Sequence, residues 1–389
     1  MTPVLLGCRV AGAPRNHEIP FMVHMQFRPP DAGGGLAMTV DPMFWCGKRV
    51  LLTGHTGFKG GWMALWLQRL GAIVTGIALP PSTLPSLFQL GCVAKGMNSH
   101  FCDIRDAAAL ASQVRLAQPE VVFHLAAQPL VRASYREPLQ TFATNLMGTA
   151  NVLDTMRGLD GVRVAVMITT DKVYRNQEHV YPYREDDVLG GHDPYSASKA
   201  ASEVVITSYR DSYLAAQGVA VASARAGNVI GGGDWSEDRL IPDAVRAWAS
   251  EQALVIRNPH AIRPWQHVLE PLAGYLILAQ KLWQQPELAG AYNFGPQTGE
   301  ASTVRDVVEL ARAAYGGGEV RYGADSGALH EAGRLALEII KVQVTLGVSP
   351  KWGLAESVRR TMAWYRTQQQ GADAGGLCEA EIAAYDALT

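Results

Sequence analysis

Short apolar runs alternate with longer amphipathic stretches along the chain after Arg49. The short runs predict buried strands at residues 50–52, 73–78, 99–102, 121–125, 164–168 and 219–224. Apolar residues at helical spacing predict helices at 62–70, 106–116 and 141–156. Strands that alternate with helices favour an α/β fold with a doubly wound parallel sheet, whose ligand crevice lies at the carboxyl ends of the strands.

The alternation is lost after about residue 231, where Gly, Pro and Arg gather in loops. A helix is still expected at 304–314, behind a capping pair formed by Thr303 and Asp306. Apolar positions at helical spacing predict another at 354–365. Shorter elements between loops indicate a smaller lobe that closes over the crevice.

Three regions are therefore expected: an extension at 1–42, a main domain at 43–230 and a smaller mixed α/β lobe, mainly 231–389, that binds the substrate. Parts of 264–290 are expected to return to the main domain. In the extension, Pro, Gly and His interrupt every apolar run. It lacks the basic and then apolar order of a targeting segment, which favours a disordered arm or a stretch upstream of a true start at Met43.

The composition excludes several classes of function. With 34 basic and 36 acidic residues, the formal net charge of -2 argues against a nucleic-acid partner. The five cysteines have neither metal-ligand nor disulfide-framework spacing, so we expect no metal. Because no uninterrupted apolar run reaches the roughly 18 residues needed to span a bilayer, we expect no membrane association and a cytoplasmic protein.

A glycine-rich turn follows the first predicted strand, with Gly54, Gly57 and Gly60 at the junction with the next helix. Missing side chains let a backbone approach a pyrophosphate, and a helix N-terminus offers amide donors to it. The turn predicts a dinucleotide site in a Rossmann domain, which also includes Thr56, Phe58 and Lys59. Lys59 could lie beside the phosphates or be a solvated side chain.

Tyr195 and Lys199 are four residues apart behind Pro194, a residue that favours a helix start, so both side chains should share one helix face. A free phenol is a poor base at neutral pH, but a neighbouring ammonium favours the phenolate. The pair therefore predicts removal of a proton from a sugar hydroxyl.

The G-x-x-G-x-x-G spacing of the turn, followed by Tyr195 and Lys199, resembles the short-chain dehydrogenase/reductase superfamily. The resemblance implies an NAD cofactor, although residues 77–80 offer neither the acid that selects NAD nor the arginine that selects NADP. It also implies four groups of cofactor contacts: Asp103 with Ile104 at the adenine, Ala126 and Ala127 at the nicotinamide ribose, Asn145, and the Tyr195 and Lys199 pair. Asp103 is equally well explained as a helix cap.

The segment Thr170-Asp171-Lys172 follows another predicted strand. Its Thr-Asp pair resembles the sugar-nucleotide 4,6-dehydratases, and Lys172 resembles the CDP-glucose 4,6-dehydratase branch, where most dehydratases carry Glu. Similar stretches extend over residues 43–362. The resemblance implies conversion of CDP-glucose to a 4-dehydro-6-deoxy sugar nucleotide, a step toward the deoxysugars of surface polysaccharides.

The resemblance also implies roles for these side chains. Tyr195 would take the proton of the 4-hydroxyl, to which Thr170 donates a hydrogen bond, and Asp171 would protonate the leaving 6-hydroxyl. Lys172 is a candidate base at C5, which requires a depressed pKa. Alternatively, Lys172 orients Asp171 or stabilises an enolate.

The remaining implied contacts are to the substrate, and Gly/Pro-rich loops supply arginines suited to a diphosphate. The expected substrate residues are Gln128, Asn228, Arg239, Arg257, Arg263, His267 and Glu331. A homodimer or homotetramer is implied as well.

Three other functional hypotheses stay open. A UDP-hexose 4-epimerase would share Thr170, Tyr195 and Lys199 but needs no acid at Asp171; another nucleotide-sugar dehydratase would differ in substrate. A non-catalytic NAD(H)-sensing regulator would be expected to have lost Tyr195 or Lys199, and both are present.

Overall fold

The computed structural model describes residues 39–323 and 333–388, which belong to one compact unit. Glu331 and most of the expected extension lie outside the described residues. Within the described part, Gln280 holds the start of the chain by accepting hydrogen bonds from Asp41 N (3.1 Å) and Trp45 Nε1 (2.8 Å). The folded part therefore includes residues just before the expected boundary at 42.

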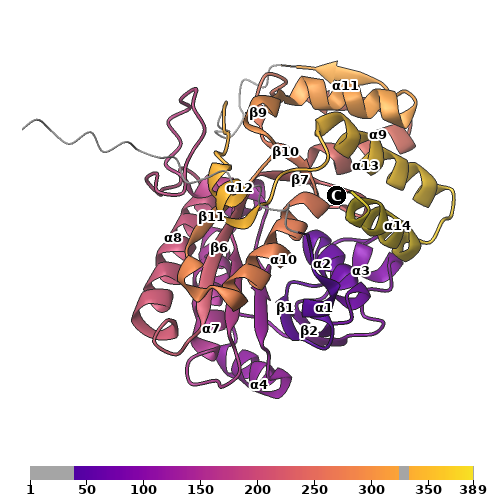
Figure 1. Ribbon diagram of the computed structural model, residues 1–389. Helices are drawn as coiled ribbons and strands as arrows, with labels where there is room; N and C mark the ends of the chain where they lie inside the picture. The colour runs from indigo at the N-terminus through magenta and orange to yellow at the C-terminus, as the bar shows by residue number, and fades with distance from the viewer. Residues whose placement is uncertain (1–38, 324–332, 389) are drawn as a thin grey trace, which may run out of the picture. The chain divides into compact units, whose positions relative to one another are not determined.

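A seven-stranded sheet forms the centre of the unit, in the order β11-β6-β5-β4-β1-β2-β3 (Figure 1). Every neighbouring pair is parallel. The strands are β1 (Arg49–Thr53), β2 (Ile73–Ala78), β3 (Asn98–Phe101), β4 (Val121–His124), β5 (Val164–Ile168), β6 (Ala220–Ala226) and β11 (Ala291–Phe294). The order reverses between β1 and β4, so the predicted doubly wound sheet is confirmed and its crevice opens at that switch point.

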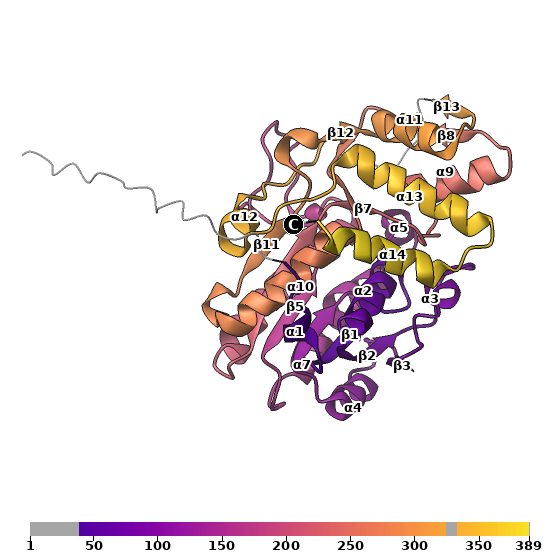
Figure 2. The same ribbon diagram turned by 45° about the vertical axis from the view of Figure 1, so that its right-hand side comes forward.

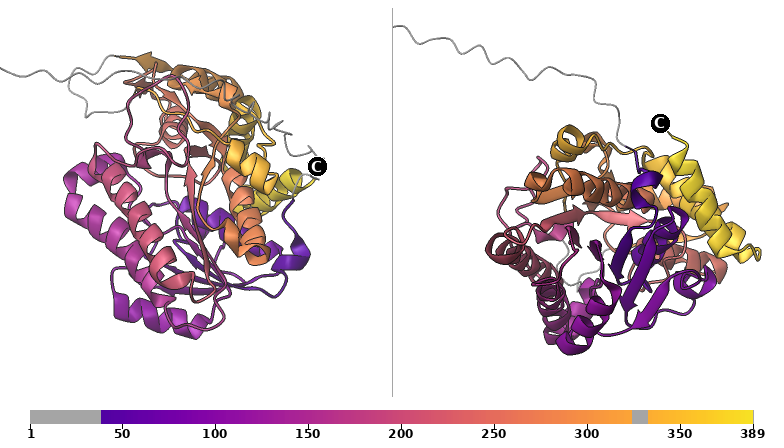
Figure 3. Two further views of the ribbon diagram at one scale, coloured as in Figure 1. Left: turned by 60° about the vertical axis from the view of Figure 1, so that its left-hand side comes forward. Right: turned by 60° about the horizontal axis from the view of Figure 1, so that its bottom comes forward.

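Helices cover both faces of this sheet (Figure 3). Apolar side chains alternate between the faces: Leu52 and Phe123 pack on one side with α2 and α10, while Leu51 and Val122 pack on the other with α4, α7 and α8. These helices are α2 (Phe58–Arg69), α10 (Leu269–Gln284), α4 (Ala107–Ala117), α7 (Gly148–Thr155) and α8 (Pro194–Tyr209).

Helix ends follow local capping chemistry. Asp106 accepts a hydrogen bond from Ala109 N and is the N-cap of α4, whereas α2 begins at Phe58, earlier than the apolar pattern alone predicts. The helix expected at 141–156 is interrupted, because its centre is a π-helix. The run consists of α6 (Pro138–Phe142), η1 (Ala143–Met147) and α7.

The chain returns to the sheet after residue 264, since α10 packs on β5 and β6 and β11 pairs with β6. In its described residues, the smaller lobe is built from three two-stranded sheets and three helices. Its elements are β7 (Asn228–Ile230) with β10 (Trp265–His267), β9 (Ile262–Arg263) with β12 (Ser302–Thr303), β8 (Leu254–Ile256) with β13 (Val320–Tyr322), α9 (Leu240–Ala249), α11 (Val304–Tyr315) and α13 (Leu354–Gln369). The predicted capping box of Thr303 and Asp306 begins α11.

The last helix, α14 (Ala374–Asp386), contacts α2 and α13 and so joins the lobe to the main domain (Figure 2). The other short elements are α1 (Pro42–Trp45), α3 (Leu87–Leu90), α5 (Val131–Arg136), α12 (Ile340–Leu346), η2 (Asp171–Val173), η3 (Arg210–Leu214), η4 (Pro286–Leu288) and η5 (Thr298–Glu300). Across residues 39–323 and 333–388, no helix combines the length and apolar character needed to cross a membrane.

Candidate active site

A large cavity of about 1250 Å³ lies at the carboxyl ends of the sheet strands. Residues that follow successive strands line it, among them Gly54, Leu79, Asp103, Ala126 and Thr170. A pocket for one small molecule typically has roughly 300–1,000 Å³. The cavity therefore has room for a cofactor and a substrate together.

The turn between β1 and α2 approaches other backbone too closely for side chains. Gly54 has a φ of 82°, and a Cβ there would lie 2.7 Å from the amide nitrogen of Ala126. A Cβ on Gly60 would lie 2.0 Å from the carbonyl oxygen of Gly54. Helix α2 has no side-chain cap, so its first amide groups are available to a phosphate. We call residues 54–60 with Ala126 and Ala127 the cofactor side.

The predicted residues of this turn, Gly54, Thr56, Gly57, Phe58, Lys59 and Gly60, all line the cavity. Lys59 is not a solvated side chain: its Nζ donates to the hydroxyl of Tyr275 (3.1 Å). Burial, with help from Lys199 and Arg239, lowers the pKa of Lys59 to about 7. The charge of Lys59 therefore interacts with the charges of Lys199, Arg239 and Asp171 around the cavity.

The other predicted cofactor residues separate into two groups. Asp103, Ile104, Ala126 and Ala127 line the cavity. Asp103 is not the cap of α4; it accepts hydrogen bonds from the Arg105 guanidinium, which lower its pKa. Asn145 is fully buried and does not line the cavity, because its amide bonds to Gln128 O (3.0 Å) and Ser198 Oγ (2.9 Å). The expected cofactor contact of Asn145 is not what the structure shows.

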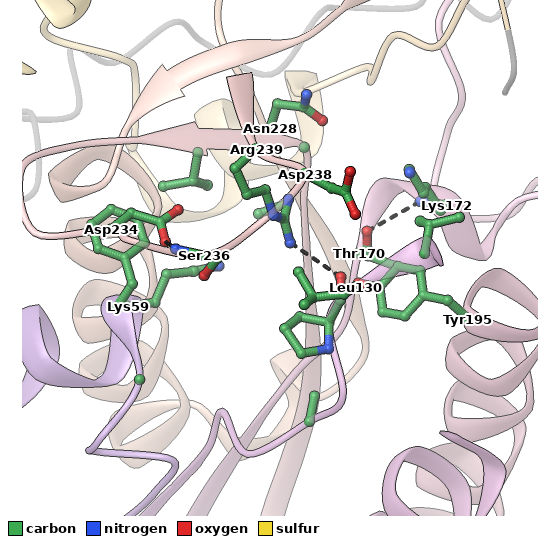
Figure 4. A pocket seen from close by; sticks show the side chains of 18 of the residues that line it. Lys59, Leu130, Thr170, Lys172, Tyr195, Asn228, Asp234, Ser236, Asp238 and Arg239 are labelled. Carbon is green, nitrogen blue, oxygen red and sulfur yellow. Dashed lines mark hydrogen bonds between the residues drawn. The ribbon is translucent and has the colours of Figure 1, made fainter. Parts of the chain in front are cut away.

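The segment after β5 carries the predicted chemistry. Thr170 caps η2 by accepting a hydrogen bond from Lys172 N (3.4 Å), and its hydroxyl donates to Asp171 Oδ1 (2.9 Å). Asp171 Oδ2 is buried without a protein partner among the described residues. Figure 4 shows Thr170, Lys172 and Tyr195 on one side of the cavity, Lys59 and Asp234 on the other, and Arg239 between them. We call Thr170-Asp171-Lys172 with Tyr195 the chemistry side.

Burial shifts the pKa values of Asp171 and Lys172 in opposite directions. Burial raises the pKa of the Asp171 carboxyl, against the effects of Lys172 and the Thr170 hydrogen bond. Burial lowers the pKa of the Lys172 ammonium; Asp171 opposes this, and Arg263 and Arg239 reinforce it. Both shifts favour the neutral forms, so the pair suits a proton donor beside a proton acceptor.

Tyr195 and Lys199 lie buried on α8, whose N-cap is Asp193. Lys199 Nζ donates to the carbonyl oxygen of Ile168 (3.1 Å) rather than to the phenol, and burial lowers its pKa to about 8. Burial raises the pKa of Tyr195, and Arg239 and the Thr170 hydrogen bond oppose the increase. In this arrangement Arg239 is the cation that most opposes the increase in the pKa of Tyr195, and the expectation that Lys199 favours the phenolate stays a prediction.

The predicted substrate residues are not all at the cavity. Asn228, Arg239, Arg257 and Arg263 line it; Arg263 is buried and Arg257 is exposed. His267 is buried between the rings of Trp62 and Trp352 and does not line the cavity. Its expected substrate contact is replaced by packing.

Gln128 is likewise used to hold the backbone. Its Nε2 donates to Thr141 Oγ1 (2.9 Å) and Leu130 O (3.1 Å), and its Oε1 accepts from Leu130 N (2.6 Å). All of these bonds shape the segment that leads into α5. Its two chain neighbours, Ala127 and Pro129, line the cavity and the half-buried Gln128 stands between them, so its substrate contact stays a prediction.

Several polar residues near the chemistry side were not predicted. Arg132 lines the cavity and pairs with Asp238 (3.4 Å). Glu203 and Arg225 form a buried ion pair (2.8 Å) directly behind the segment after β5. Only the spacing of Glu203 could have indicated its place, because it stands four residues after Lys199 and therefore lies on the same helix face.

The sequence profile of the family described as GDP-mannose 4,6 dehydratase matches residues 51–367. This chain belongs to that family. The CDP-glucose 4,6-dehydratase of Salmonella typhimurium is 45% identical over 356 residues, which cover 90% of this chain and 99% of the relative. The UDP-glucose 4-epimerase of Mycoplasma pneumoniae is 24% identical over 334 residues, covering 82% of this chain and 97% of the relative.

Solved structures related to this dehydratase family share the fold. The dTDP-glucose 4,6-dehydratase DesIV of Streptomyces venezuelae, with NAD and TYD bound, has a TM-score of 0.71 at 24% identity and covers 82% of this chain and 98% of its own. The UDP-glucose 4-epimerase of Stenotrophomonas maltophila, with bound NAD, has a TM-score of 0.71 at 23% identity and covers 83% and 99%. Because dehydratase and epimerase match equally well, the fold does not separate the two reactions.

Proposed function

We propose that the protein converts CDP-D-glucose to CDP-4-dehydro-6-deoxy-D-glucose and water. The C4 alcohol becomes a ketone, water leaves across C5 and C6, and C6 is reduced to a methyl group, so the sequence is redox-neutral. The observation that carries the proposal is the buried Asp171 in the cavity that also holds Tyr195, because burial raises the pKa of this carboxyl and so favours the protonated form that an acid needs. An epimerase needs no such acid, and the 45% identity to a CDP-glucose 4,6-dehydratase supports the same choice.

The cofactor side fits NAD. A pyrophosphate would lie against the cradle that a Cβ at Gly54 or Gly60 would fill, at the uncapped start of α2. Asp103 and Ile104 would border the adenosine part, and Ala126 with Lys199 the nicotinamide part. When bound there, the nicotinamide would supply the hydride chemistry for oxidation at C4 and reduction at C6.

Each side chain of the chemistry side has one task in this proposal. Tyr195 takes the 4-hydroxyl proton, while Thr170 hydrogen-bonds the same oxygen. The new ketone acidifies the C5 hydrogen. Asp171 then gives its proton to the leaving 6-hydroxyl, and Lys172, whose pKa burial lowers in favour of the neutral amine, takes the C5 proton.

The arginines of the smaller lobe would bind the diphosphate. Arg263 is held against Ile262 O (2.9 Å) and Arg239 against Pro129 O (3.1 Å) (Figure 4), so both guanidinium groups are positioned in advance. Arg257 is exposed at the rim, and Asn228 adds an amide from β7. The choice of cytosine rests on the similarity to the Salmonella relative.

The test is incubation of the purified protein with CDP-, dTDP-, GDP- and UDP-activated glucose or mannose, after its NAD content has been measured. We expect a 4-keto-6-deoxy product, detected by its absorbance in alkali, from CDP-glucose in preference to the others. Formation of the C4 epimer without this product would contradict the proposal. Binding without any turnover would favour the regulatory hypothesis.

We infer that the protein assembles as a homodimer or homotetramer in the cytoplasm. Large apolar side chains are exposed on the helices beside α8: Leu139 on α6, Met147 on η1 and Val204 on α8 itself are 84%, 54% and 60% exposed. Sedimentation of the wild type and of Leu139→Glu tests this inference. A monomeric wild type would contradict it.

A further inference from the structure

A buried carboxylate, Glu203, lies behind the chemistry side. Its Oε1 accepts a hydrogen bond from Thr169 Oγ1 (2.5 Å), and its Oε2 accepts from Ser223 Oγ (2.7 Å) and Arg225 Nη2 (2.8 Å). The side chains of Arg225 and Glu203 are only 4% and 3% exposed. Neither residue lines the cavity, so neither can touch a ligand there.

Arg225 extends the contact to the other end of the catalytic segment. Its Nη1 donates to the hydroxyl of Tyr174 (2.9 Å) and to Glu185 O (2.9 Å), and its guanidinium carbon lies 5.1 Å from the centre of the Tyr174 ring. The Tyr174 hydroxyl in turn donates to Asn293 Oδ1 (2.6 Å) on β11. Tyr174 is therefore fixed from two strands of the sheet.

The two contacts enclose Thr170-Asp171-Lys172 along the chain. Thr169, just before the segment, bonds to Glu203, and Tyr174, shortly after it, bonds to Arg225. The ion pair joins both ends to each other and to α8, the helix that carries Tyr195. The groups that act on C4 and those that act on C5 and C6 are thus connected through one pair.

We propose that the Glu203 and Arg225 pair is a positioning device for the elimination step, setting Asp171 and Lys172 relative to Tyr195. This inference rests on the proposed dehydration. In that step the C5–H bond breaks toward Lys172, its electron pair forms the C5=C6 bond, and the C6–O bond breaks as the oxygen takes the proton of Asp171. Two proton transfers on one substrate demand accurate placement, and a misplacement of about 1 Å can cost on the order of 100-fold in rate.

Stability alone is a weak explanation for the pair, because a buried ion pair often contributes no more than well-packed apolar side chains would. The chain offers a comparison in Glu270. This buried carboxylate also accepts several hydrogen bonds, from Lys351 N (3.1 Å), Trp352 N (2.7 Å) and Tyr385 Oη (2.7 Å), and none of these three partners belongs to the catalytic segment.

The experiment therefore uses matched substitutions. Glu203→Gln is compared with Glu270→Gln, and the milder Tyr174→Phe with Tyr385→Phe. Within each pair the same chemical change is made at a buried hydrogen-bonded site: an amide replaces a carboxylate, or a phenol loses its hydroxyl. Thermal midpoint, kcat, KM, loss of deuterium from C5-labelled substrate and the absorbance of reduced cofactor are measured for every variant.

We expect all four variants to lose thermal stability. Glu203→Gln should also lower kcat by roughly 10- to 100-fold at nearly unchanged KM, with slower C5 exchange and accumulation of reduced cofactor, since oxidation at C4 precedes the affected step. Tyr174→Phe should show the same pattern to a smaller degree. Glu270→Gln and Tyr385→Phe should keep kcat within about 3-fold.

Equal effects on kcat within each matched pair would overturn the positioning role. So would a fall in kcat that comes with unchanged C5 exchange. Failure of the proposed function is recognised separately, because the wild type would then form no 4-keto-6-deoxy product.

Discussion

The two sides of the cavity differ in what equips them for their tasks: glycines without side chains on one, buried ionisable side chains on the other. On the cofactor side the decisive feature is missing volume: a Cβ at Gly60 would lie 2.0 Å from Gly54 O, and the groups offered to a ligand are the uncapped backbone amides at the start of α2. On the chemistry side the decisive feature is buried charge, because Asp171 and Lys172 are shifted toward their neutral forms. One side is defined by shape and the other by proton affinity.

This difference implies that the two sides should fail in different ways. A side chain added to the cofactor side should weaken cofactor binding, while bound cofactor still reacts. A changed functional group on the chemistry side should leave binding intact and stop a particular step. The comparison would be wrong if a substitution on the cofactor side stopped a reaction step, or if one on the chemistry side weakened cofactor binding.

The largest effect is expected from Asp171→Asn. The amide keeps the shape of the carboxyl but cannot supply the proton for the 6-hydroxyl, so formation of the 4-keto-6-deoxy product should fall by roughly 10²- to 10⁴-fold. Oxidation at C4 should persist, which is seen as reduced cofactor that accumulates in a single turnover. Retention of normal product formation would remove Asp171 from the mechanism.

The next largest effect concerns Lys172. If its neutral amine removes the C5 proton, Lys172→Ala should slow deuterium loss from C5 by about 100-fold. Exchange in the wild type should rise with pH and level off above the pKa of Lys172. That pKa lies below the usual value for lysine, because burial, Arg263 and Arg239 lower it more than Asp171 and Asp193 raise it.

A control for this experiment is the same pH series with Lys172→Ala, in which the rising limb should vanish. Exchange at the normal rate in that variant would instead support the alternatives in which Lys172 orients Asp171 or stabilises an enolate. The cofactor content of the variant should equal that of the wild type.

An intermediate effect is expected on the cofactor side. In Gly60→Ala the added methyl group meets the backbone of Gly54, which cannot move away without changing the turn. Overpacking of this kind costs about 1–3 kcal/mol, so NAD affinity should fall roughly 10- to 100-fold, with kcat at saturating NAD within about 3-fold of normal. Gly299→Ala is the matched control, since its Cβ would meet nothing within 4 Å.

The sequence predicted most strands and the loops that follow them, because short apolar runs and the residues after them can be recognised from neighbouring residues alone. The strands at 73–78 and 164–168 have the predicted bounds, and Gly54, Thr170 and Tyr195 all line the cavity, as expected for residues that follow or face strand ends. Burial and long-range packing were harder to predict. His267 was expected at the substrate, but its ring is buried against Trp62 and Trp352, which are distant in the chain.

The increase in the pKa of Tyr195 through burial was not predicted, for a related reason. Spacing places Lys199 on the same helix face, but it does not reveal that the ammonium bonds to Ile168 O or that the phenol is buried. The Arg225 and Glu203 pair was missed because the residues belong to β6 and α8, and only the folded sheet brings them together.

The smallest expected effect separates two arginines of the smaller lobe and tests whether buried charge matters beyond the chemistry side. Arg263 is 9% exposed and also lowers the pKa of Lys172, whereas Arg257 is exposed at the rim. Hydrogen bonds to a charged group are worth about 1.5–3 kcal/mol when buried, but exposed pairs contribute about 0–1 kcal/mol. Arg263→Ala should therefore raise KM by at least about 10-fold, and Arg257→Ala by no more than about 3-fold. Since Arg263 is among the groups that lower the pKa of Lys172 and Arg257 is not, removal of Arg263 rather than of Arg257 should move the rising limb of the C5-exchange profile to higher pH. Equal effects of the two substitutions on KM and on this profile would mean that the loops of the smaller lobe close and bury Arg257 when the substrate binds.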